Sequence, residues 1–478
     1  MKTASRRRTA PALLAVLLAL VCGTAVLAAP ALAEEGETAA PAAEESAPAA
    51  EVAPAEETAP AEEEPAYSAD VPPELASAHA LLIDRETGLV LLDKGSHERW
   101  YPASVTKVMT ALLTIENVGL DEMVTVTEED LEEVTWESSI AGLVPGDTLS
   151  VRDLLAGLMI PSGNDASYVL ARYVGGGDWH AFVDMMNERA AELGCTDTHF
   201  VNPCGLHDDD HYSTCADLVL MFEEALKHPE FVEVSSQFTW ELPATAAAPA
   251  RKLENTDTLI DPESPVYMGD DIVSSKTGST WEGGRSLIAL FERDGRSLVG
   301  VVLGAPMETD EAGVSPNFYD MRELLEWGFN AWRTGEVVSV GDVVGSAEVT
   351  LSSDGDAVDA TATSSIVATV PTETTLADLT LVPSWSEALQ APVAEGVALG
   401  EVAVSLGDRD LGTVTASTAH AMELSVPDYA LWWVTSDPRH TAMVAGAAAG
   451  VLVVAGVVIA LVVRARRRRA TSGSHMKK

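Results

Sequence analysis

The sequence predicts an α+β fold in which an antiparallel sheet carries a helical insertion, followed by a small all-β domain and one transmembrane helix. Three observations lead to this expectation. Strand patterns stand at both ends of a globular stretch, residues 69–335, with helical patterns between them. Short Val- and Thr-rich strands separated by Gly-Asp turns fill residues 336–426. An uncharged apolar run then occupies residues 441–463.

The N-terminal residues 1–33 have the pattern of a signal peptide. Basic residues such as Lys2 and Arg6 precede an apolar run, and Ala31-Leu32-Ala33 offers an A-x-A cleavage site. An uncleaved anchor is the alternative, because the apolar run is long enough to span a bilayer. Residues 34–68 are dominated by Ala, Glu and Pro, so we expect a disordered linker there.

Apolar spacing predicts the elements of residues 69–335 in order. Residues 80–84 and 89–92 are expected to form two strands joined by a turn at Glu86-Thr87-Gly88. The remaining expected elements are helices at 104–117, 151–158 and 179–193, a strand pair at 286–290 and 297–303 around a turn at Asp294-Gly295, and a closing helix at 317–332.

The C-terminal end predicts a single-pass membrane anchor. A juxtamembrane segment, residues 427–440, contains Trp432 and Trp433, which are typical of a membrane interface. The apolar run at 441–463 is followed by a basic tail, residues 464–478, which the positive-inside rule places in the cytoplasm. The folded domains are therefore expected outside the cytoplasm, at the cell membrane.

Acidic residues dominate the chain. The formal charge is −45, and without the basic residues of the two termini 18 Lys and Arg stand against 74 Asp and Glu, a charge of −56. Such a surface disfavours nucleic acid as a partner. Solubility or a salt-rich setting accounts for the excess without any specific function.

Three cysteines remain after removal of a signal peptide: Cys195, Cys204 and Cys215. One disulfide among them is compatible with an extracytoplasmic location, and three packed thiols explain the sequence nearly as well. No pair has the spacing of a strong metal-ligand motif. We expect neither a metal nor a cofactor.

Three short motifs follow one another in the first domain. They are Ser104-Val-Thr-Lys107, Ser162-Gly-Asn164 and Lys276-Thr277-Gly278. Each is weak alone, since a second S-x-x-K occurs at residues 474–477 and a second S-x-N at residues 315–317. Their order and their placement at the ends of elements indicate function.

A lysine three residues after a serine suits nucleophilic catalysis. A serine hydroxyl needs a nearby base, and helical spacing puts Ser104 and Lys107 on one face, one turn apart. Lys107 can act as a base only if its pKa is lowered, which burial and a second cation, Lys276, would both do. In isolation, the alternative is a helix cap followed by a solvated lysine.

The other two motifs supply groups that hold a substrate. Ser162 can relay a proton to a leaving amine, and Asn164 can hydrogen-bond both substrate and lysine. Lys276 and Thr277, on a strand edge, can hold a carboxylate, and Gly278 permits close backbone approach. An ordinary turn and an ordinary strand end are the structural alternatives.

With these motifs the chain resembles the low-molecular-mass penicillin-binding proteins, the serine-type D-Ala-D-Ala carboxypeptidases. The resemblance covers roughly residues 69–426. It extends to the nucleophile segment Pro102-Ala103-Ser104, to Thr198-His-Phe-Val-Asn-Pro203 and to Ala391-Pro-Val393 in the C-terminal domain. It implies the penicillin-binding protein/β-lactamase-like transpeptidase fold.

The resemblance also implies a mechanism. Ser104 would attack the D-Ala-D-Ala carbonyl with Lys107 as base, and the backbone N–H groups of Ser104 and Ser279 would hold the oxyanion. Peptidoglycan stem peptides are the implied substrates, and β-lactams would acylate the same serine. Three departures, Ser279 itself, Ser274-Ser275 and Cys204, bear on fine substrate preference rather than on the reaction class.

Other activities remain open on the same fold. A β-lactamase of class A would need a dedicated glutamate, and no convincing segment for it lies between the second and third motifs. A DD-endopeptidase would use the same acylation site, so the sequence cannot separate it from a carboxypeptidase. A non-catalytic β-lactam sensor or wall-binding protein is the alternative from a different class.

Overall fold

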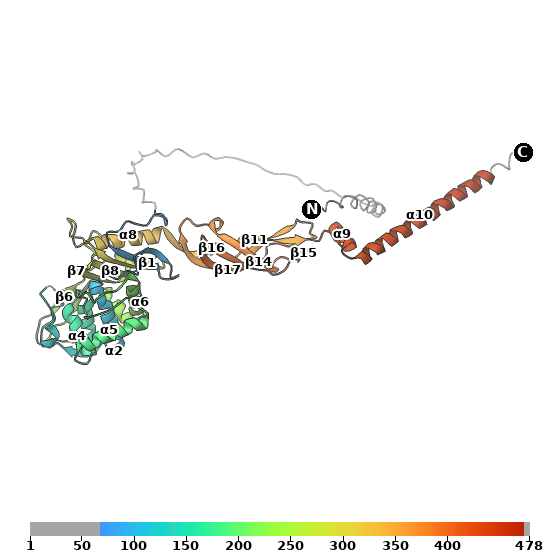
Figure 1. Cartoon of the computed structure of the whole chain (residues 1–478). Coiled ribbons are helices and arrows are strands. Elements are labelled where there is room, and N and C mark those ends of the chain that lie inside the picture. The colour runs from blue at the N-terminus through green and yellow to red at the C-terminus, as the bar shows by residue number, and fades with distance from the viewer. Residues whose placement is uncertain (1–66, 137, 473–478) are drawn as a thin grey trace, which may run out of the picture. The chain divides into compact units, whose positions relative to one another are not determined.

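The computed structural model describes residues 67–136 and 138–472. The expected signal peptide, nearly all of the expected linker and the second S-x-x-K motif lie outside these residues. The described chain contains a sheet domain, a β domain and two C-terminal helices (Figure 1).

The centre of the sheet domain is a five-stranded antiparallel sheet in the order β2-β1-β9-β8-β7. Strands β1 and β2 precede the helical insertion and β7 to β9 follow it, which confirms the predicted α+β arrangement. In the β8–β9 turn, Asp294 and Gly295 both have positive φ, 52° and 79°, as a two-residue hairpin turn requires. The strands are β1 (His79–Asp84), β2 (Val90–Lys94), β7 (Ile272–Thr280), β8 (Gly284–Arg293) and β9 (Arg296–Ala305).

Helices cover both faces of this sheet, with α8 (Pro316–Asn330) on one face and the helical insertion on the other (Figure 1). The insertion contains α2 (Lys107–Asn117), α3 (Val151–Met159), α4 (Asn164–Val174), α5 (Trp179–Leu193), α6 (Cys215–Ala225) and α7 (Pro229–Ser235). Its short elements are η2 (Ala103–Thr106), η3 (Glu129–Leu131), η4 (Gly269–Asp271) and the hairpins β3 (Met123–Thr125) with β4 (Thr148–Ser150) and β5 (Thr239–Leu242) with β6 (Arg251–Glu254).

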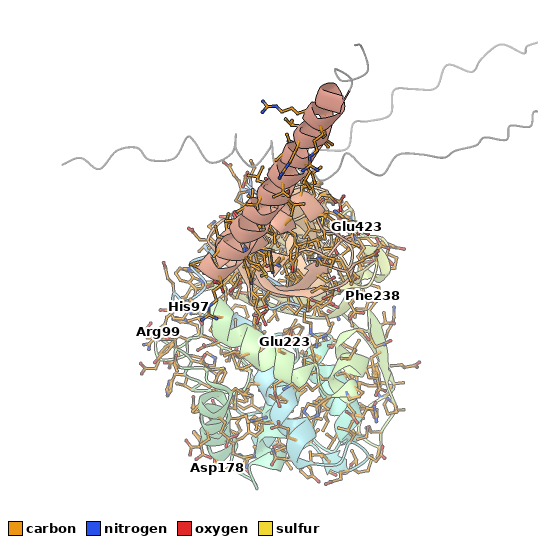
Figure 2. The ribbon with its side chains drawn as sticks, turned by 90° about the vertical axis from the view of Figure 1, so that its right-hand side faces the viewer. His97, Arg99, Asp178, Glu223, Phe238 and Glu423 are labelled. Atoms are coloured by element: carbon orange, nitrogen blue, oxygen red, sulfur yellow. The ribbon has the colours of Figure 1, made fainter. Side chains whose placement is uncertain are left out.

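The period-two alternation of the strands divides the core into two layers. On β8, Ile288 and Leu290 pack with the helical insertion, whereas Leu287 and Phe291 pack with α8. At the edge of the helical layer, Glu223 on α6, labelled in Figure 2, accepts hydrogen bonds from Arg85 at 2.9 and 3.0 Å. Both faces of the sheet are therefore buried. Strand β7 lies at one edge of the sheet, where no further strand pairs with it.

One predicted helix end was wrong. The helix expected over residues 104–117 is observed, with its first turn as the 3-10 helix η2 and the remainder as α2, which starts at Lys107. The closing helix was expected to reach Trp332, but α8 ends at Asn330 and Trp332 opens strand β10. Backbone pairing of Trp332 with Pro371 on β13 overrides the helical spacing of its side chain.

The β domain has two sheets. Strand β10 (Trp332–Val338) pairs with β13 (Ile366–Pro371), and the other strands form a six-stranded sheet in the order β14-β16-β17-β12-β11-β15. Their bounds are β11 (Val343–Thr350), β12 (Ala357–Ala362), β14 (Thr380–Trp385), β15 (Leu389–Gln390), β16 (Ala398–Leu406) and β17 (Arg409–Thr418), with the short helix η5 (Leu376–Asp378).

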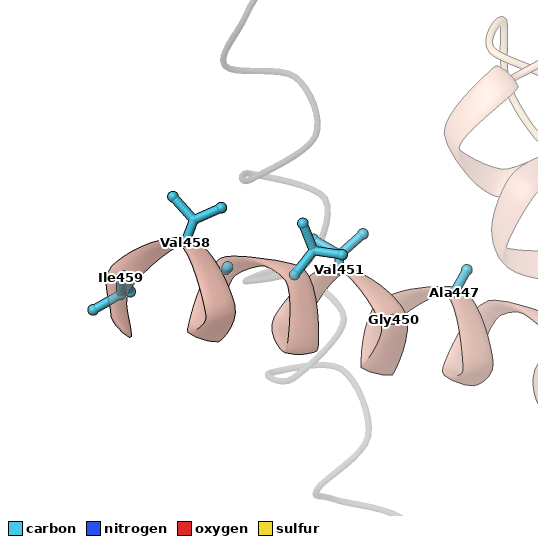
Figure 3. Close-up of a pocket in the computed structure, with 7 residues that line it drawn as sticks. Ala447, Gly450, Val451, Val458 and Ile459 are labelled. Atoms are coloured by element: carbon cyan, nitrogen blue, oxygen red, sulfur yellow. The ribbon is translucent and has the colours of Figure 1, made fainter. Parts of the chain in front are cut away.

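Helices α9 (Val426–Ser436) and α10 (Pro438–Ser472) end the described chain. Residues 438–468 of α10 have a mean hydropathy of 2.7 and form the one helix of the described chain that is long and apolar enough to cross a membrane. Val451 and Val458, seven residues apart, project from the same side of α10 in Figure 3. Residues 441–463 of the helix carry no charged side chain, as a lipid-facing segment requires.

Candidate active site

Ser104 and Lys107 meet because Ser104 lies in the 3-10 turn η2 and Lys107 follows directly, as its C-cap and the first residue of α2. Side chains three residues apart eclipse in this helix, and Lys107 Nζ lies 2.8 Å from Ser104 Oγ. Ala103, which precedes the serine, has a left-handed backbone with φ of 50°, a conformation that costs free energy for a residue with a side chain. Ser104 is half-buried, whereas Lys107 is fully buried. The hydroxyl can be reached, and the amine beneath it is shielded from water.

Lys107 Nζ contacts three oxygen acceptors. Besides Ser104 Oγ, it lies 2.8 Å from Asn164 Oδ1 and 2.8 Å from the carbonyl oxygen of Cys204. Burial lowers the pKa of Lys107 to about 8, although Cys204 and Asp165 favour the charged form. Once the amine is neutral it has a free lone pair, and the Ser104 hydroxyl can then donate to it.

The Ser162 turn places the second motif beside the first. Ser162 has a φ of 62°, and Asn164 begins α4 two residues later. The turn is held by Gly163 N donating to the carbonyl of Gly157 at 3.0 Å, and a Cβ on Gly163 would approach that oxygen to 2.6 Å. Only glycine fits there. The strained backbone at Ser162 is thus fixed by its neighbours, as is typical of functional positions.

Lys276 reaches the Ser162 turn from strand β7. Its Nζ donates to Ser162 Oγ at 3.0 Å and to the carbonyl oxygen of Thr277 at 2.8 Å, and its side chain is buried. Burial lowers the pKa of Lys276 well below its usual value, the charge of Lys107 lowers it further, and Asp257 acts in the opposite direction. The sequence predicted that a second cation would help to depress the pKa of Lys107. In the structure, burial is the cause that lowers the pKa of Lys107, and the repulsion between the two amines acts on Lys276 instead.

Gly278 brings β7 against the nucleophile turn. A Cβ on Gly278 would lie 2.9 Å from the carbonyl oxygen of Pro102 and 3.1 Å from the amide nitrogen of Ser104. Thr277 Oγ1 lies on the opposite side of the strand, 2.5 Å from Thr256 Oγ1. Since β7 is the outermost strand of the sheet, the Lys276-Thr277-Gly278 segment forms one wall of the site.

Several supporting residues were missed by the sequence reasoning. Asp165 accepts from the backbone N–H groups of Ala141 and Leu143, at 2.9 Å each, and so ties a loop to α4. Ser138 Oγ accepts from Asn164 Nδ2 at 3.1 Å. Asp165 follows Asn164 directly and could have been found by position, but nothing in the sequence distinguishes Ser138.

His211 stabilises the turn η2, which carries Ser104, through a hydrogen bond to Thr106. Its Nδ1 accepts from the backbone N–H of Val201 at 3.3 Å, so Nε2 carries the proton and donates to Thr106 Oγ1 at 2.8 Å. Burial lowers the pKa of His211 to about 3. The ring therefore stays neutral, and its bond to Thr106 persists, throughout the physiological pH range.

The second S-x-N motif and the three cysteines do not contribute side chains to the site around Ser104. Ser315 of the second S-x-N motif donates to Asn317 Oδ1 at 2.7 Å where α8 begins, on the far face of the sheet from the helical insertion. Cys195, Cys204 and Cys215 are three separate buried thiols. Within the described residues, no group of three or more His, Cys, Asp or Glu is arranged to hold a metal ion.

Comparison with known families agrees with this arrangement. Residues 66–307 match the family model described as D-alanyl-D-alanine carboxypeptidase, which is half of the chain. The chain belongs to this family. Residues 332–424 match a second model, the C-terminal domain of penicillin-binding protein 5, and this match begins where β10 begins.

Individual relatives give the same result. The chain is 32% identical over 262 residues to the D-alanyl-D-alanine carboxypeptidase DacF of Bacillus subtilis, covering 53% of this chain and 62% of that protein. It is 32% identical over 290 residues to DacD of Escherichia coli, covering 58% and 69%. The crystal structure of penicillin-binding protein 5 from Haemophilus influenzae is similar over 74% of this chain and 99% of its own, with a TM-score of 0.53 and 25% identity.

These comparisons confirm two predictions, the resemblance to the penicillin-binding proteins and the transpeptidase fold with an appended β domain. Family membership supports a hydrolase of the serine D-Ala-D-Ala carboxypeptidase class.

Proposed function

We propose that this chain is a membrane-anchored carboxypeptidase that removes the terminal D-Ala from peptidoglycan stem pentapeptides through an acyl-enzyme on Ser104. The observation that carries the proposal is the contact between Lys107 Nζ and Ser104 Oγ, 2.8 Å, at an amine whose pKa burial lowers to about 8. The carboxypeptidase relatives support the choice of substrate class.

In the acylation step, neutral Lys107 takes the proton of Ser104 as Oγ attacks the carbonyl carbon of the D-Ala-D-Ala bond. The backbone N–H groups of Ser104 and Ser279 hold the oxyanion of the tetrahedral intermediate. The C–N bond then breaks, and the leaving amine gains, through the Ser162 hydroxyl, the proton that Lys107 took from Ser104, so Lys107 is neutral again; Ser162 Oγ lies 3.0 Å from Lys276 Nζ. Free D-Ala and an acylated serine result.

Deacylation follows the same route in reverse order. Water, activated by neutral Lys107, attacks the ester carbonyl, and the bond to Ser104 Oγ breaks as that oxygen regains its proton. A β-lactam acylates Ser104 in the same way, but its cleaved amide stays attached to the adduct and hydrolysis is slow. The protein is thus expected to bind β-lactams covalently.

Substrate binding is assigned to the walls of the site. Asn164 Nδ2 and the edge of β7 would hold the peptide backbone, and Gly278 lets it approach closely. Lys276 and Thr277 would lie on the carboxylate side of the scissile bond. No cofactor is required by this chemistry.

The C-terminal helix is the proposed membrane anchor. Residues 438–468 of α10 have the length and hydropathy of a membrane span. Arg464 and Arg466 follow the apolar run, so we assign the tail to the cytoplasm and the sheet and β domains to the outer side, where peptidoglycan lies. Protease digestion of intact cells, with tags at both ends, would test this orientation.

The full-length protein in detergent should be incubated with a fluorescent penicillin and with a peptide ending in Lys-D-Ala-D-Ala. The proposal expects covalent labelling and D-Ala release, both absent from Ser104→Ala. Labelling without release would favour a β-lactam sensor, and rapid penicillin turnover would favour a β-lactamase. A cross-linked muropeptide in the same assay would reveal DD-endopeptidase activity.

A further inference from the structure

The Asn164 side chain lies between the proposed base and a surface loop. Its Oδ1 is 2.8 Å from Lys107 Nζ, and its Nδ2 donates to Ser138 Oγ at 3.1 Å. Asn164 is buried, and Ser138 is half-buried. A half-turn about the last side-chain bond of an asparagine exchanges its oxygen and nitrogen with little change of shape. The contacts that hold the amide in one orientation therefore matter for the chemistry at Lys107.

The orientation of the Asn164 amide decides where neutral Lys107 directs its lone pair. A neutral amine has two N–H groups and one lone pair, and Lys107 Nζ contacts three oxygens at 2.8 Å. The amide oxygen of Asn164 and the carbonyl oxygen of Cys204 can only accept, so they take the two N–H groups. The lone pair then faces the hydroxyl of Ser104, as a general base requires.

The opposite orientation of the amide would take the lone pair away from Ser104. Nδ2 would then face Lys107 and donate to the neutral amine, in competition with the Ser104 hydroxyl. A charged Lys107 has no lone pair, so the turned amide would meet it with donor against donor. The turned state is therefore open only to the neutral amine, and it is unproductive.

We infer that Ser138 is a positioning residue for the base: it holds the Asn164 amide with its oxygen towards Lys107, which keeps the lone pair of that amine on the nucleophile. This inference rests on the proposed function, in which Lys107 takes the proton of Ser104. It deepens that function by assigning a role to a residue outside the three motifs.

The hydrogen bonds of Ser138 make its hydroxyl an acceptor towards Asn164. A hydroxyl has one hydrogen and two lone pairs. Two N–H groups donate to Ser138 Oγ and occupy both lone pairs, the backbone N–H of Thr135 at 3.3 Å and Asn164 Nδ2 at 3.1 Å. The hydroxyl hydrogen is left for Thr135 Oγ1, 3.2 Å away. A turned amide would bring its oxygen against a hydroxyl whose hydrogen is already engaged.

Other contacts hold the loop of Ser138 against α4. The carbonyl oxygen of Ser139 accepts from the backbone N–H of Asn164 at 2.8 Å, and Ser139 Oγ donates to the carbonyl oxygen of Pro161 at 2.5 Å. Asp165 accepts from two further backbone N–H groups of the loop, at 2.9 Å each. Loss of the Ser138 hydroxyl should therefore free the amide without moving the loop.

The test is the pH dependence of acylation, measured by stopped flow with a chromogenic β-lactam and the full-length protein in detergent. Burial lowers the pKa of Lys107 to about 8, so the wild-type rate should level off above that pH. In Ser138→Ala this plateau should fall about 3- to 10-fold, the effect of losing one hydrogen bond, because the neutral amine is then shared with an unproductive state.

The loss in Ser138→Ala should depend on pH. Below about pH 7 the rate should stay within about twofold of the wild type, because the charged amine that prevails there excludes the turned amide. The turned amide stabilises only the neutral form of Lys107, so the midpoint of the profile should move down by about half a pH unit to one unit. Damage to the loop would instead lower the rate equally at every pH.

The other titratable groups that interact with Lys107 are the same in the proteins compared. They are Asp165 on α4, Cys204 and His211 on the segment before α6, and Lys276 on β7. A midpoint that differs between Ser138→Ala and Ser138→Thr therefore reports the hydrogen bonds of Ser138. Ser138→Thr keeps the hydroxyl and should restore the wild-type plateau.

Two further variants separate positioning from damage to the loop. Thr135→Val removes the acceptor of the Ser138 hydrogen, which frees that hydroxyl to donate to a turned amide. It should lower the plateau less than Ser138→Ala does, with the same pH dependence. Ser139→Ala is the matched control on the same loop and should leave the whole profile unchanged.

A double-mutant cycle shows whether Ser138 acts through Asn164. In Asn164→Ala there is no amide to turn, so adding Ser138→Ala should change the plateau by less than about twofold. A loss that persists in that background, or that is equal at every pH, would mean that Ser138 only supports the loop and would overturn the inference. An unchanged plateau in Ser138→Ala would overturn it too. Absence of any acylation in the wild type would overturn the proposed function itself, and the inference with it.

Discussion

The sheet domain and the β domain bury different kinds of side chain. Lys107, Asp165 and Lys276 are all buried in the sheet domain, close to one another around Ser104 and Ser162. In residues 332–425, which the structure describes completely, the buried side chains are apolar apart from a few hydroxyl groups, and none is charged. The two domains are of the same chain and face the same solvent, so the difference reflects their tasks.

Burying an ionisable group costs free energy unless hydrogen bonds replace its hydration. In the sheet domain that cost is offset by specific partners, such as the three oxygen acceptors around Lys107 Nζ. Burial lowers the pKa of this lysine, so it can act as a base near neutral pH, whereas a solvent-exposed lysine stays protonated. The β domain has no such groups because its core only needs to be stable.

The largest effect is expected at the nucleophile. Ser104→Ala should abolish penicillin labelling and D-Ala release, because of the three oxygens that Lys107 Nζ contacts only Ser104 Oγ belongs to a hydroxyl. Labelling is checked by in-gel fluorescence, and folding by circular dichroism. Ser353→Ala, an exposed serine of the β domain, is the control and should label normally. Residual labelling of the Ser104 variant would point to a different nucleophile.

Removal of the base comes next. Lys107→Met keeps an unbranched buried side chain, one atom shorter, that cannot accept a proton, so the acylation rate should fall by about 10²- to 10⁴-fold. Stopped-flow measurement with a chromogenic β-lactam gives that rate. A loss of less than about threefold would exclude Lys107 as the general base.

The pH dependence of acylation by the wild type should report the lowered pKa of Lys107. Lys107 must be neutral to act, and burial lowers its pKa to about 8. The acylation rate should therefore rise about tenfold per pH unit below pH 8 and level off above it. A rate that is flat between pH 6 and pH 9 would contradict this assignment.

A buried anion beside the base should shift that profile. Asn164→Asp places a carboxylate next to Lys107 Nζ, where Asn164 Oδ1 now lies at 2.8 Å. The anion favours the charged amine, so the midpoint should move up by about one pH unit or more. Asn164→Ala removes the contact without adding charge and should not move the midpoint upward. The pair of variants separates the electrostatic effect from loss of substrate contacts.

The smallest effect on chemistry is expected in the β domain. Val402→Ala removes two methyl groups from a fully buried position on β16 and should lower the free energy of unfolding of that domain by about 1–3 kcal/mol. Calorimetry would detect the change as a lower transition temperature. Acylation should stay within about twofold of the wild type. A larger loss would show that the two domains are coupled.

Much of the fold was accessible from the sequence because the periodicity of apolar residues is a local signal. The helix at Trp179–Leu193 was predicted with its observed bounds, and the Asp294-Gly295 turn indicated the β8–β9 hairpin. The end of α8 was missed, since Trp332 pairs with Pro371, a residue far along the chain that no local pattern reveals. Where an element ends depends on whether its last residues hydrogen-bond within a helix or pair with a strand that is distant in the sequence.

The sequence by itself determined the order of elements, the apolar C-terminal span and the three motifs that carry Ser104, Ser162 and Lys276. Only the tertiary structure decided which of these side chains meet and that Ser138 and His211 support them. The reason is physical: composition and periodicity are properties of neighbouring residues, whereas burial, and with it the pKa of Lys107, depends on segments that approach only after folding.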